Sequence, residues 1–317
     1  MSARMIMKND YSKRSMPLNW GVSKSLTTSF ALILLYATNF GLPGGPGDGA
    51  QLTGYLQNRT VRYSFTVRNK TNRLIKGAEF WTYAPVKQTS FQKTGTIEAS
   101  HDFTLSEDEI GNQRLIFKLD LAPFATKVVA ITARLDLSEK SNPIVLDTSA
   151  DYTGHQKYIE IDNPKIIALS RQFAGNEVNT ELESAFDWVA ENIEYAGYIE
   201  DDRGALYALE NKRGDCTEYM YLFAALARTK NIPTRAIGGY VVSEDAVLKA
   251  KDFHNWAEVY IEGSWRVVDP QNRKFLQEES NYIAMRVISG PANKTNDLLS
   301  NTHRFSHVGE GLHVRMN

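Results

Sequence analysis

Two stretches decide the fold: GDCTEYMYLFAALARTKNIPTRAIGGYV at residues 214–241 and HNWAEVYIEGSWRVVDPQ at residues 254–271. In the first, apolar residues recur at helical spacing from Tyr219 to Ala227, and Pro233 cannot continue the helix. Three β-rich runs follow, at residues 236–242, 254–261 and 265–269. Helices followed by an antiparallel sheet predict an α+β arrangement for this part of the chain.

Cys216 is the single cysteine of the 317 residues, and Gly214 and Asp215 place a turn immediately before it. We expect a helix to begin at or just after Cys216. A thiol at a helix N-terminus meets the positive end of the helix dipole, which favours the nucleophilic thiolate. The unpaired N–H groups there can also donate to an oxyanion. The alternative interpretation is an inert thiol that fills the core. One cysteine excludes an intrachain disulfide and a zinc site built on several thiolates.

A hairpin brings His254 and Asp269 together in the sequence interpretation. Glu262 and Gly263 lie between two strands and predict a two-residue turn. Such a turn gives four pairs, namely Ile261 with Ser264, Tyr260 with Trp265, Glu258 with Val267 and Trp256 with Asp269. His254 and Asp269 then become diagonal neighbours on one face, with Cβ atoms roughly 7–8 Å apart. A carboxylate on one imidazole nitrogen leaves the other nitrogen for a nucleophile. Taken singly, each residue also fits a solvated histidine or a turn-forming aspartate.

These two stretches resemble the transglutaminase-like family of papain-related folds, and the resemblance covers roughly residues 180–275. It implies helices packed on an antiparallel sheet, with Cys216 as the nucleophile, His254 as the base and Asp269 as the orienting acid. It further implies a cysteine-dependent acyl transfer on amide or peptide substrates through a thioester. Hydrolysis is the expected outcome, and transfer to a protein amine is the alternative. A non-catalytic scaffold that binds peptide or cell-wall material is the alternative from another class.

Four aromatic residues are further candidates for the site. The family's oxyanion partner is a side chain upstream of the cysteine, and Tyr207 and Trp188 are the candidates for it here. Core packing is the competing interpretation for both, because aromatic side chains mostly fill interiors. Trp256, two residues after His254, is expected to shield the His–Asp pair, and Tyr240 is expected to line the cleft.

The chain before these stretches has a different period. From Val61 to Val67, apolar and polar residues alternate, and similar runs recur at residues 115–119 and 128–135 between turn-forming residues. This pattern predicts an all-β sandwich over residues 51–142, followed by a catalytic domain over residues 143–317. The sandwich also resembles the domain found before such cores in exported bacterial proteins. After a β-like run at residues 282–289, the sequence shows little pattern.

Residues 1–50 are predicted to be a targeting segment and a linker. Residues 1–25 hold five Lys and Arg against Asp10 alone, and the apolar run FALILLYA follows at residues 30–37. This layout is typical of a secretory signal, and the run is too short to span a bilayer. No clean cleavage site follows Ala37, so the segment could remain as a marginal membrane anchor. The Gly- and Pro-rich residues 41–49 indicate a flexible tether. We therefore expect export to the periplasm or the outer face of the membrane, with a buried core element as the alternative.

The charge balance excludes one class of partner. Lys plus Arg total 36 and Asp plus Glu total 37, which gives a formal charge of −1 and no global basic field for nucleic acid. Nothing resembles a phosphate loop or a dinucleotide fingerprint, and we expect neither a cofactor nor a metal. The expected partner is a peptide or protein amide substrate, and the oligomeric state stays open.

Overall fold

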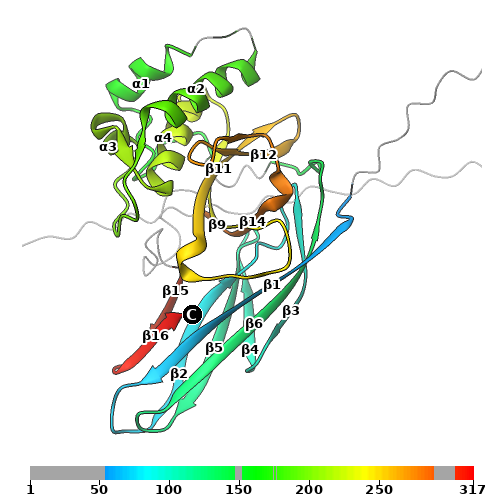
Figure 1. Ribbon diagram of the computed structural model, residues 1–317, viewed down its shortest axis with the longest axis vertical. Coiled ribbons are helices and arrows are strands. Elements are labelled where there is room, and N and C mark those ends of the chain that lie inside the picture. Colours follow the sequence, from blue (N-terminus) through cyan, green and yellow to red (C-terminus); the bar gives the residue numbers. More distant parts are fainter. Residues whose placement is uncertain (1–53, 147–151, 174, 176, 289–303) are drawn as a thin grey trace, which may run out of the picture. The chain divides into compact units, whose positions relative to one another are not determined.

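An α+β fold with a β-sandwich followed by a helical part is seen in the computed structural model (Figure 1). The structure describes residues 54–146, 152–173, 175, 177–288 and 304–317. The predicted targeting segment and linker, residues 1–50, lie outside the described residues. None of the helices in the described part combines the length and the apolar character needed to cross a membrane.

The helices and strands follow one another in two groups. The sandwich strands come first, and they are β1 (Gln57–Asn69), β2 (Ile75–Ala84), β3 (Gln92–Ala99), β4 (Phe103–Glu107), β5 (Gln113–Leu121) and β6 (Thr126–Leu137). The helices come next, together with two short strands, and they are α1 (Pro164–Ser170), α2 (Val178–Asn192), β7 (Glu194–Tyr195), α3 (Ala205–Asn211), β8 (Arg213–Gly214) and α4 (Cys216–Arg228). The remaining strands are β9 (Thr234–Val241), β10 (Ala246–Val247), β11 (Phe253–Ile261), β12 (Ser264–Asp269), β13 (Lys274–Phe275), β14 (Tyr282–Ile288), β15 (Phe305–Val308) and β16 (Leu312–Met316).

The sandwich consists of two sheets that bury one face each. One has the strand order β10-β1-β6-β3, with β16 also paired to β1, and the other has the order β15-β2-β5-β4. The predicted alternation is confirmed in β1, where every second residue from Val61 to Val67 is buried. Across the interface, the Phe65 and Phe80 rings lie 4.9 Å apart, and Phe80 stacks on Phe117 at 5.6 Å. The core is therefore formed by every second side chain of the strands, as expected for a sandwich.

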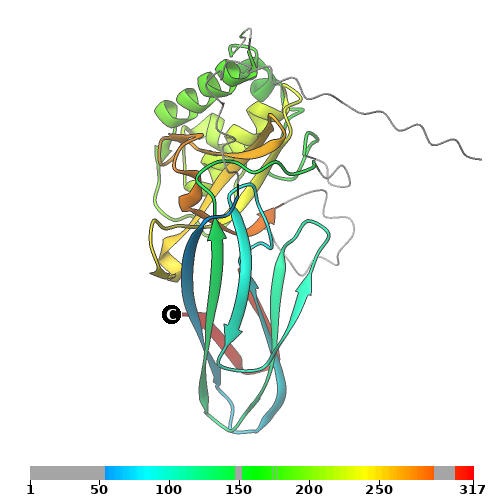
Figure 2. The same ribbon diagram turned by 90° about the vertical axis from the view of Figure 1, so that its right-hand side faces the viewer.

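The C-terminal strands belong to the sandwich rather than to the helical part. β15 pairs with β2, and β16 pairs with β1 in a register that places Met316 opposite Phe65. Figure 2 shows these red strands among the blue and cyan strands of the sandwich. The prediction of little pattern in this segment, and of a sandwich that ends at residue 142, therefore omitted two strands. They contain only 4 and 5 residues, too few for a local period to emerge.

The helical part packs on a second antiparallel sheet. Its strand order is β13-β12-β11-β9-β14, and the buried helix α4 lies against β11 and β9 (Figure 1). The other three helices pack on α4 and complete one apolar core. Gly239 in β9 allows a close approach of β14, because a Cβ there would lie 2.1 Å from the carbonyl oxygen of Ile283.

The β11–β12 hairpin has the predicted register. Ile261 pairs with Ser264, Tyr260 with Trp265 and Glu258 with Val267, and the ladder ends one pair before Trp256 and Asp269. Both turn residues have positive φ, 51° at Glu262 and 78° at Gly263, as a type I′ turn requires. A two-residue turn thus fixes which side chains of the two strands share a face.

Buried hydrogen bonds connect the sandwich to the sheet of the helical part. Gln92 in β3 donates through Nε2 to the Ala284 carbonyl at 3.1 Å and accepts from the Ala284 N–H at 2.9 Å. Arg59 in β1 donates to the carbonyls of Val242 and Ser280 at 2.5 and 3.2 Å. Both parts belong to one compact unit of the chain, so side chains from both can line one cleft.

Candidate active site

The capping of helix α4 sets the position of Cys216. Asp215 is the N-cap residue, and its Oδ1 accepts a hydrogen bond from the Thr217 N–H at 2.8 Å. Glu218 completes a capping box, because its Oε2 accepts from the Asp215 N–H at 3.0 Å. Cys216 is therefore the first residue of α4, which confirms the predicted start of this helix. Its partly exposed thiol lies at the positive end of the helix dipole.

The second oxygens of the same two carboxylates hold residues 196–203, which we name the cleft loop. Asp215 Oδ2 accepts from the Ile199 N–H at 2.9 Å, and Glu218 Oε1 accepts from the Arg203 N–H at 2.9 Å. Both carboxylates are buried. Burial is the main cause that raises the pKa of Glu218 to about 7, while its two backbone hydrogen bonds oppose this shift. The start of α4 and the path of the cleft loop thus depend on the same two side chains.

His254 in β11 and Asp269 in β12 contact each other across the hairpin. His254 Nε2 lies 2.7 Å from Asp269 Oδ2, and because the carboxylate only accepts, Nε2 is the donor. Asp269 is almost fully buried, and its Oδ2 also accepts from the Tyr282 hydroxyl at 2.9 Å and from Asn272 Nδ2 at 2.8 Å. Three donors therefore fix the carboxylate, and the carboxylate in turn fixes the imidazole.

The Cys216 side chain affects the pKa of His254. Burial alone would lower the pKa of His254, but hydrogen bonds to Asp269 and to the Cys216 side chain, together with their negative charges, raise it to about 10. The imidazole is thus protonated at neutral pH. The structure thus places His254 against Asp269, with the Cys216 side chain close enough to affect the pKa of the imidazole.

Two of the predicted aromatic residues lie near this group. Trp256 is fully buried, with its ring 6.4 Å from the His254 ring at an interplanar angle of 23°. Its other neighbour is Tyr282, at 5.1 Å between ring centroids. Tyr240 in β9 lines the cleft beside Cys216, and its hydroxyl contacts the Met316 sulfur at 3.3 Å. Trp256 therefore covers the His–Asp pair from within the core, and Tyr240 forms part of a wall.

The two predicted oxyanion candidates, Trp188 and Tyr207, are not among the residues that line the cleft. Trp188 in α2 packs beside Phe173, and the Lys212 ammonium lies 4.0 Å from the centre of its ring. Tyr207 in α3 faces the Arg203 guanidinium at 5.1 Å. These contacts fit the competing interpretation of core and surface packing, and a role for either ring as oxyanion partner stays a prediction.

Asn255 is a neighbour of the thiol that the sequence interpretation missed. Its Nδ2 donates to Thr217 Oγ1 at 3.0 Å and lies 3.6 Å from Cys216 Sγ. The alternation that gives His254 and Asp269 a common face places Asn255 on the opposite face, with Ala257. That face packs against α4, so Asn255 reaches the start of the helix. The position of α4 relative to the sheet was needed to find it.

Tyr195 is a second neighbour that the sequence interpretation missed. It lies in β7, which pairs with β8 so that Tyr195 is opposite Gly214. Burial raises the pKa of its phenol, and the negative charges of Cys216 and Asp215 raise it further. A phenol upstream of the cysteine thus lies within electrostatic reach of the thiol. A strand of two residues gives no sequence pattern, so nothing local marks Tyr195.

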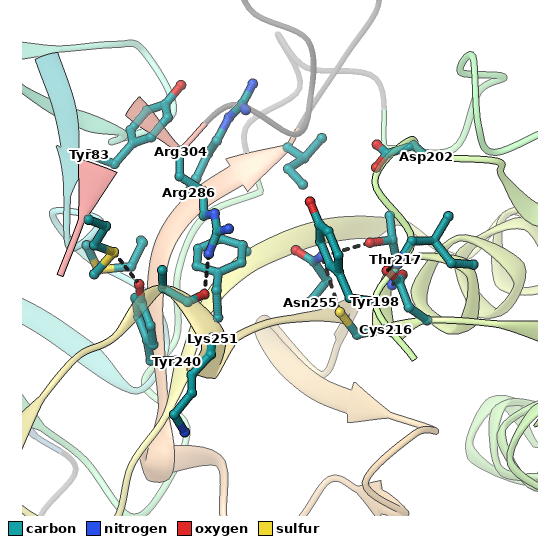
Figure 3. A pocket seen from close by; sticks show the side chains of 18 of the residues that line it. Tyr83, Tyr198, Asp202, Cys216, Thr217, Tyr240, Lys251, Asn255, Arg286 and Arg304 are labelled. Atoms are coloured by element: carbon teal, nitrogen blue, oxygen red, sulfur yellow. Dashed lines mark hydrogen bonds between the residues drawn. The ribbon is translucent and has the colours of Figure 1, made fainter. Parts of the chain in front are cut away.

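A cleft of about 510 Å³ opens beside Cys216 (Figure 3). The helical part supplies Cys216, Thr217 and Asn255, together with part of the cleft loop. The sandwich supplies aromatic side chains from β1 and β2 and the C-terminal Met316. The thiol therefore lies at one side of a cavity that both parts of the chain line. Among the described residues, no group of three or more His, Cys, Asp and Glu is placed to hold a metal ion.

Comparisons with known proteins agree with this fold. A family model described as the transglutaminase-like superfamily matches residues 167–270. A presumed cysteine protease from Cytophaga hutchinsonii has a TM-score of 0.54 at 17% identity, and the alignment covers 82% of this chain and 92% of that chain. This likeness shows a shared fold that includes most of the described part.

Two further proteins are more distant. The periplasmic domain of TgpA from Pseudomonas aeruginosa has a TM-score of 0.35 at 16% identity, covering 66% of this chain and 89% of that domain. An uncharacterized protein of Mycobacterium leprae is 24% identical over 161 residues, which are 49% of this chain and 56% of the relative. That match spans little more than half of the relative's length.

Proposed function

We propose that this chain, which belongs to the transglutaminase-like superfamily through residues 167–270, is a cysteine-dependent acyl-transfer enzyme that acts on amides. The observation that carries the proposal is the position of His254. Its Nε2 contacts Asp269 at 2.7 Å, and the Cys216 side chain lies close enough to help raise its pKa. This arrangement supports Cys216 as the nucleophile, His254 as the base and Asp269 as the orienting acid.

The first half-reaction is an acylation. The Cys216 thiolate adds to the amide carbonyl carbon, and the protonated His254 donates its Nδ1 proton to the leaving nitrogen. The carbon–nitrogen bond breaks, an amine leaves, and a thioester to Cys216 remains. In the second half-reaction, His254 takes a proton from water, the hydroxide attacks the thioester, and the carboxylic acid leaves. Asp269 keeps Nε2 protonated, so that Nδ1 faces the reacting atoms in both steps.

Donors near the sulfur are suited to stabilise the oxyanion of both tetrahedral intermediates. The backbone N–H of Cys216 is one of the unpaired groups at the start of α4. Asn255 Nδ2, 3.6 Å from the sulfur, is the side-chain donor that we assign to this task in place of Tyr207 and Trp188. Tyr195 is the alternative, because its phenol lies within electrostatic reach of Cys216.

Water is the acyl acceptor that we favour. An amine transferase must keep water from the thioester, which requires a dry tunnel with apolar walls. Aromatic side chains form such walls, and the strands beside the site contribute Trp256, Trp265 and Tyr240. Trp256 and Trp265 are buried in the core and are not among the residues that line the cleft, whereas Tyr240 is. Neither Trp256 nor Trp265 therefore walls off a separate tunnel for an amine, and this supports a peptidase or amidase. The aromatic residues that do line the cleft are left for the acyl substrate.

A non-catalytic scaffold is the alternative from another class. Against it stands the hydrogen-bond network around Asp269, since a binding surface gains nothing from a carboxylate that orients an imidazole toward a thiol. Iodoacetamide separates the two proposals. An enzyme of this kind should react at Cys216 much faster than a free thiol at pH 6, and the reaction should slow in His254→Gln. Equal rates in both proteins would favour the scaffold.

We also propose export, on the basis of the basic and apolar layout of residues 1–50. The test is a fusion of this segment to a reporter that is active only outside the cytoplasm. A cleaved or membrane-retained fusion with reporter activity supports export. A soluble, inactive fusion overturns it.

The decisive experiment traps the thioester. The purified protein is mixed with peptides that contain glutamine or asparagine, quenched in acid and analysed by mass spectrometry. We expect an acyl adduct on the peptide that carries Cys216, and free acid as the main product. A labelled primary amine in large excess tests the acceptor: if labelled conjugate exceeds free acid at every amine concentration, transfer replaces hydrolysis. No adduct with any substrate, together with ordinary thiol reactivity, overturns the enzyme proposal.

A further inference from the structure

The cleft beside Cys216 has opposite charges on its two sides. The cleft loop contributes Glu200 and Asp202, and Figure 3 shows Asp202 on the same side as Thr217 and Cys216. Arg286 and Arg304 lie on the side of Tyr83 and Tyr240 (Figure 3). The carboxylates of the cleft loop therefore disfavour an anionic substrate group on their side of the cleft, and the two guanidinium groups favour one on the other side.

The wall between these charges is apolar. Tyr63, Phe65 and Met285 are almost fully buried and line the cleft. The Tyr63 hydroxyl donates to the Tyr83 carbonyl at 3.0 Å, and the Tyr240 hydroxyl contacts the Met316 sulfur, so these phenols have partners within the protein. A surface of this kind suits an aliphatic or aromatic substrate group.

Arg304 is held in place at the positive side. Its guanidinium lies over the Phe253 ring at 4.6 Å, and its Nη1 donates to the Ala250 carbonyl at 2.7 Å. The ion pairs found among the described residues do not include Arg304. Arg286 lies over the Tyr83 ring at 5.2 Å. A planar guanidinium supported by a ring is a geometry that recognises carboxylates.

We propose that Arg304, assisted by Arg286, binds a carboxylate of the acyl substrate while the aromatic wall binds an apolar group next to it. The substrate class is then a peptide that combines an apolar residue with a carboxylate, either a free C-terminus or an acidic side chain. The carboxylate lies away from Cys216, on the side opposite the cleft loop. This inference rests on the proposed function, because it takes Cys216 as the acylated atom.

Alkylating probes that react with Cys216 test the inference without a known substrate. N-bromoacetyl-phenylalanine carries an apolar ring and a carboxylate, and N-bromoacetyl-phenylalaninamide is its neutral counterpart. A second pair replaces phenylalanine by glutamic acid α-amide and glutamine amide, so that the carboxylate comes from a side chain. A third pair, bromoacetate and bromoacetamide, lacks the amino-acid part of the long probes and reports the field at the sulfur. The alkylation rate of Cys216 is followed by intact-protein mass spectrometry.

We expect one of the two long pairs to react about tenfold faster as the acid than as the amide, as one charge-assisted contact predicts. The pair that shows this preference identifies the carboxylate as C-terminal or side-chain. In Arg304→Gln the preference should fall to about one, while the bromoacetate-to-bromoacetamide ratio stays constant. The matched control is Arg114→Gln, which removes an arginine that lies over the Trp81 ring outside the cleft, and it should keep the preference.

Two results would overturn the inference. One is equal reaction of acid and amide in both long pairs of the unaltered protein. The other is a preference that survives in Arg304→Gln. Failure of the proposed function gives a different result, because bromoacetamide would then alkylate Cys216 no faster than it alkylates the thiol of His254→Gln.

Discussion

The sandwich and the helical part differ in the charged side chains that they bury. Among the described residues, Arg59 is the one charged side chain buried in the sandwich strands, and its guanidinium donates to carbonyls of the helical part. The helical part and its sheet bury seven, namely Asp215, Glu218, Arg228, Arg235, Glu258, Asp269 and Glu279. Burial of a charge is unfavourable unless hydrogen bonds or an opposite charge compensate, so each of these positions needs a reason.

The buried charges of the helical part are of two kinds. Arg235 and Glu258 lie opposite each other on β9 and β11 and neutralise each other at 2.6 Å. Asp215 and Asp269 instead accept hydrogen bonds from backbone groups or from neutral and imidazole donors around Cys216. Buried charge alone therefore does not locate the site. The site is located by a buried carboxylate that orients other groups beside a nucleophile.

The largest expected effect comes from Cys216→Ala. Loss of the nucleophile should lower turnover about 10⁴-fold or more, because members of such a group act as a unit. The substitution removes one sulfur at a partly exposed helix start, so the thermal midpoint should stay the same. Hydrolysis assays and calorimetry measure the two quantities. Turnover close to that of the unaltered protein would show that the nucleophile is elsewhere.

Glu258→Ala tests the buried pair of opposite charges, Arg235 and Glu258, which lies outside the cleft. It leaves the Arg235 guanidinium buried without its carboxylate, which typically costs about 3–5 kcal/mol of unfolding free energy. Urea unfolding should show this loss, while kcat of the protein that remains folded should not change. Glu258→Gln is the matched control, since its amide oxygen still accepts from Arg235, and it should lose less. A fall in kcat without a loss of stability would instead show that Glu258 contributes to the active site.

Asn255→Ala tests the proposed oxyanion donor. Removal of one such donor lowers kcat about 10²-fold in comparable sites, and KM should change little. Asn192→Ala is the matched control, because Asn192 in α2 bonds to the Trp188 carbonyl at 2.9 Å within its own helix. Both variants should fold normally in circular dichroism. If Asn255→Ala keeps kcat, Tyr195→Phe becomes the next variant.

The smallest expected effect is on the pH dependence of the free energy of unfolding. The pKa of His254 is about 10 in the folded chain, against an ordinary value of about 6.5 in the unfolded chain. The His254 imidazole therefore holds a proton between these values that it lacks in the unfolded chain, and its stabilisation is complete below pH 6.5. It should be lost as the pH rises toward 10, at about 1.4 kcal/mol per pH unit for one proton. The Cys216 thiolate of the proposed mechanism releases a proton that offsets this one, so the comparison is made without the thiol. Urea unfolding of Cys216→Ala and of Cys216→Ala combined with His254→Gln should differ in this slope. Parallel curves would contradict the pKa shift.

Local patterns were sufficient to predict part of the site. Asp215 and Glu218 flank Cys216 at capping-box spacing, and the helix begins where the sequence indicates. The Glu262–Gly263 turn sets a register that follows from counting residues, and it gives His254 and Asp269 a common face. Each of these features depends on residues that lie close together in the sequence.

The remaining features depend on contacts between distant segments. Tyr282 reaches Asp269 because β14 lies beside β9. Asn255 reaches Cys216 because α4 packs on the face of β11 that carries Asn255 and Ala257. Trp188 was a candidate by residue type, but in the structure it contacts Lys212 and Phe173 and does not line the cleft. Neither composition nor period reports how a helix is rotated on a sheet, so these assignments required the structure.

The pairing of β16 with β1 orders events during protein synthesis. A hydrogen bond from Thr66 to Asn317 spans 251 residues of the chain, and Met316 lines the cleft. The ribosome delivers Cys216 and His254 well before this strand. A nascent chain can therefore form α4 and the hairpin while one wall of its cleft is still missing, because contacts over such separations form last.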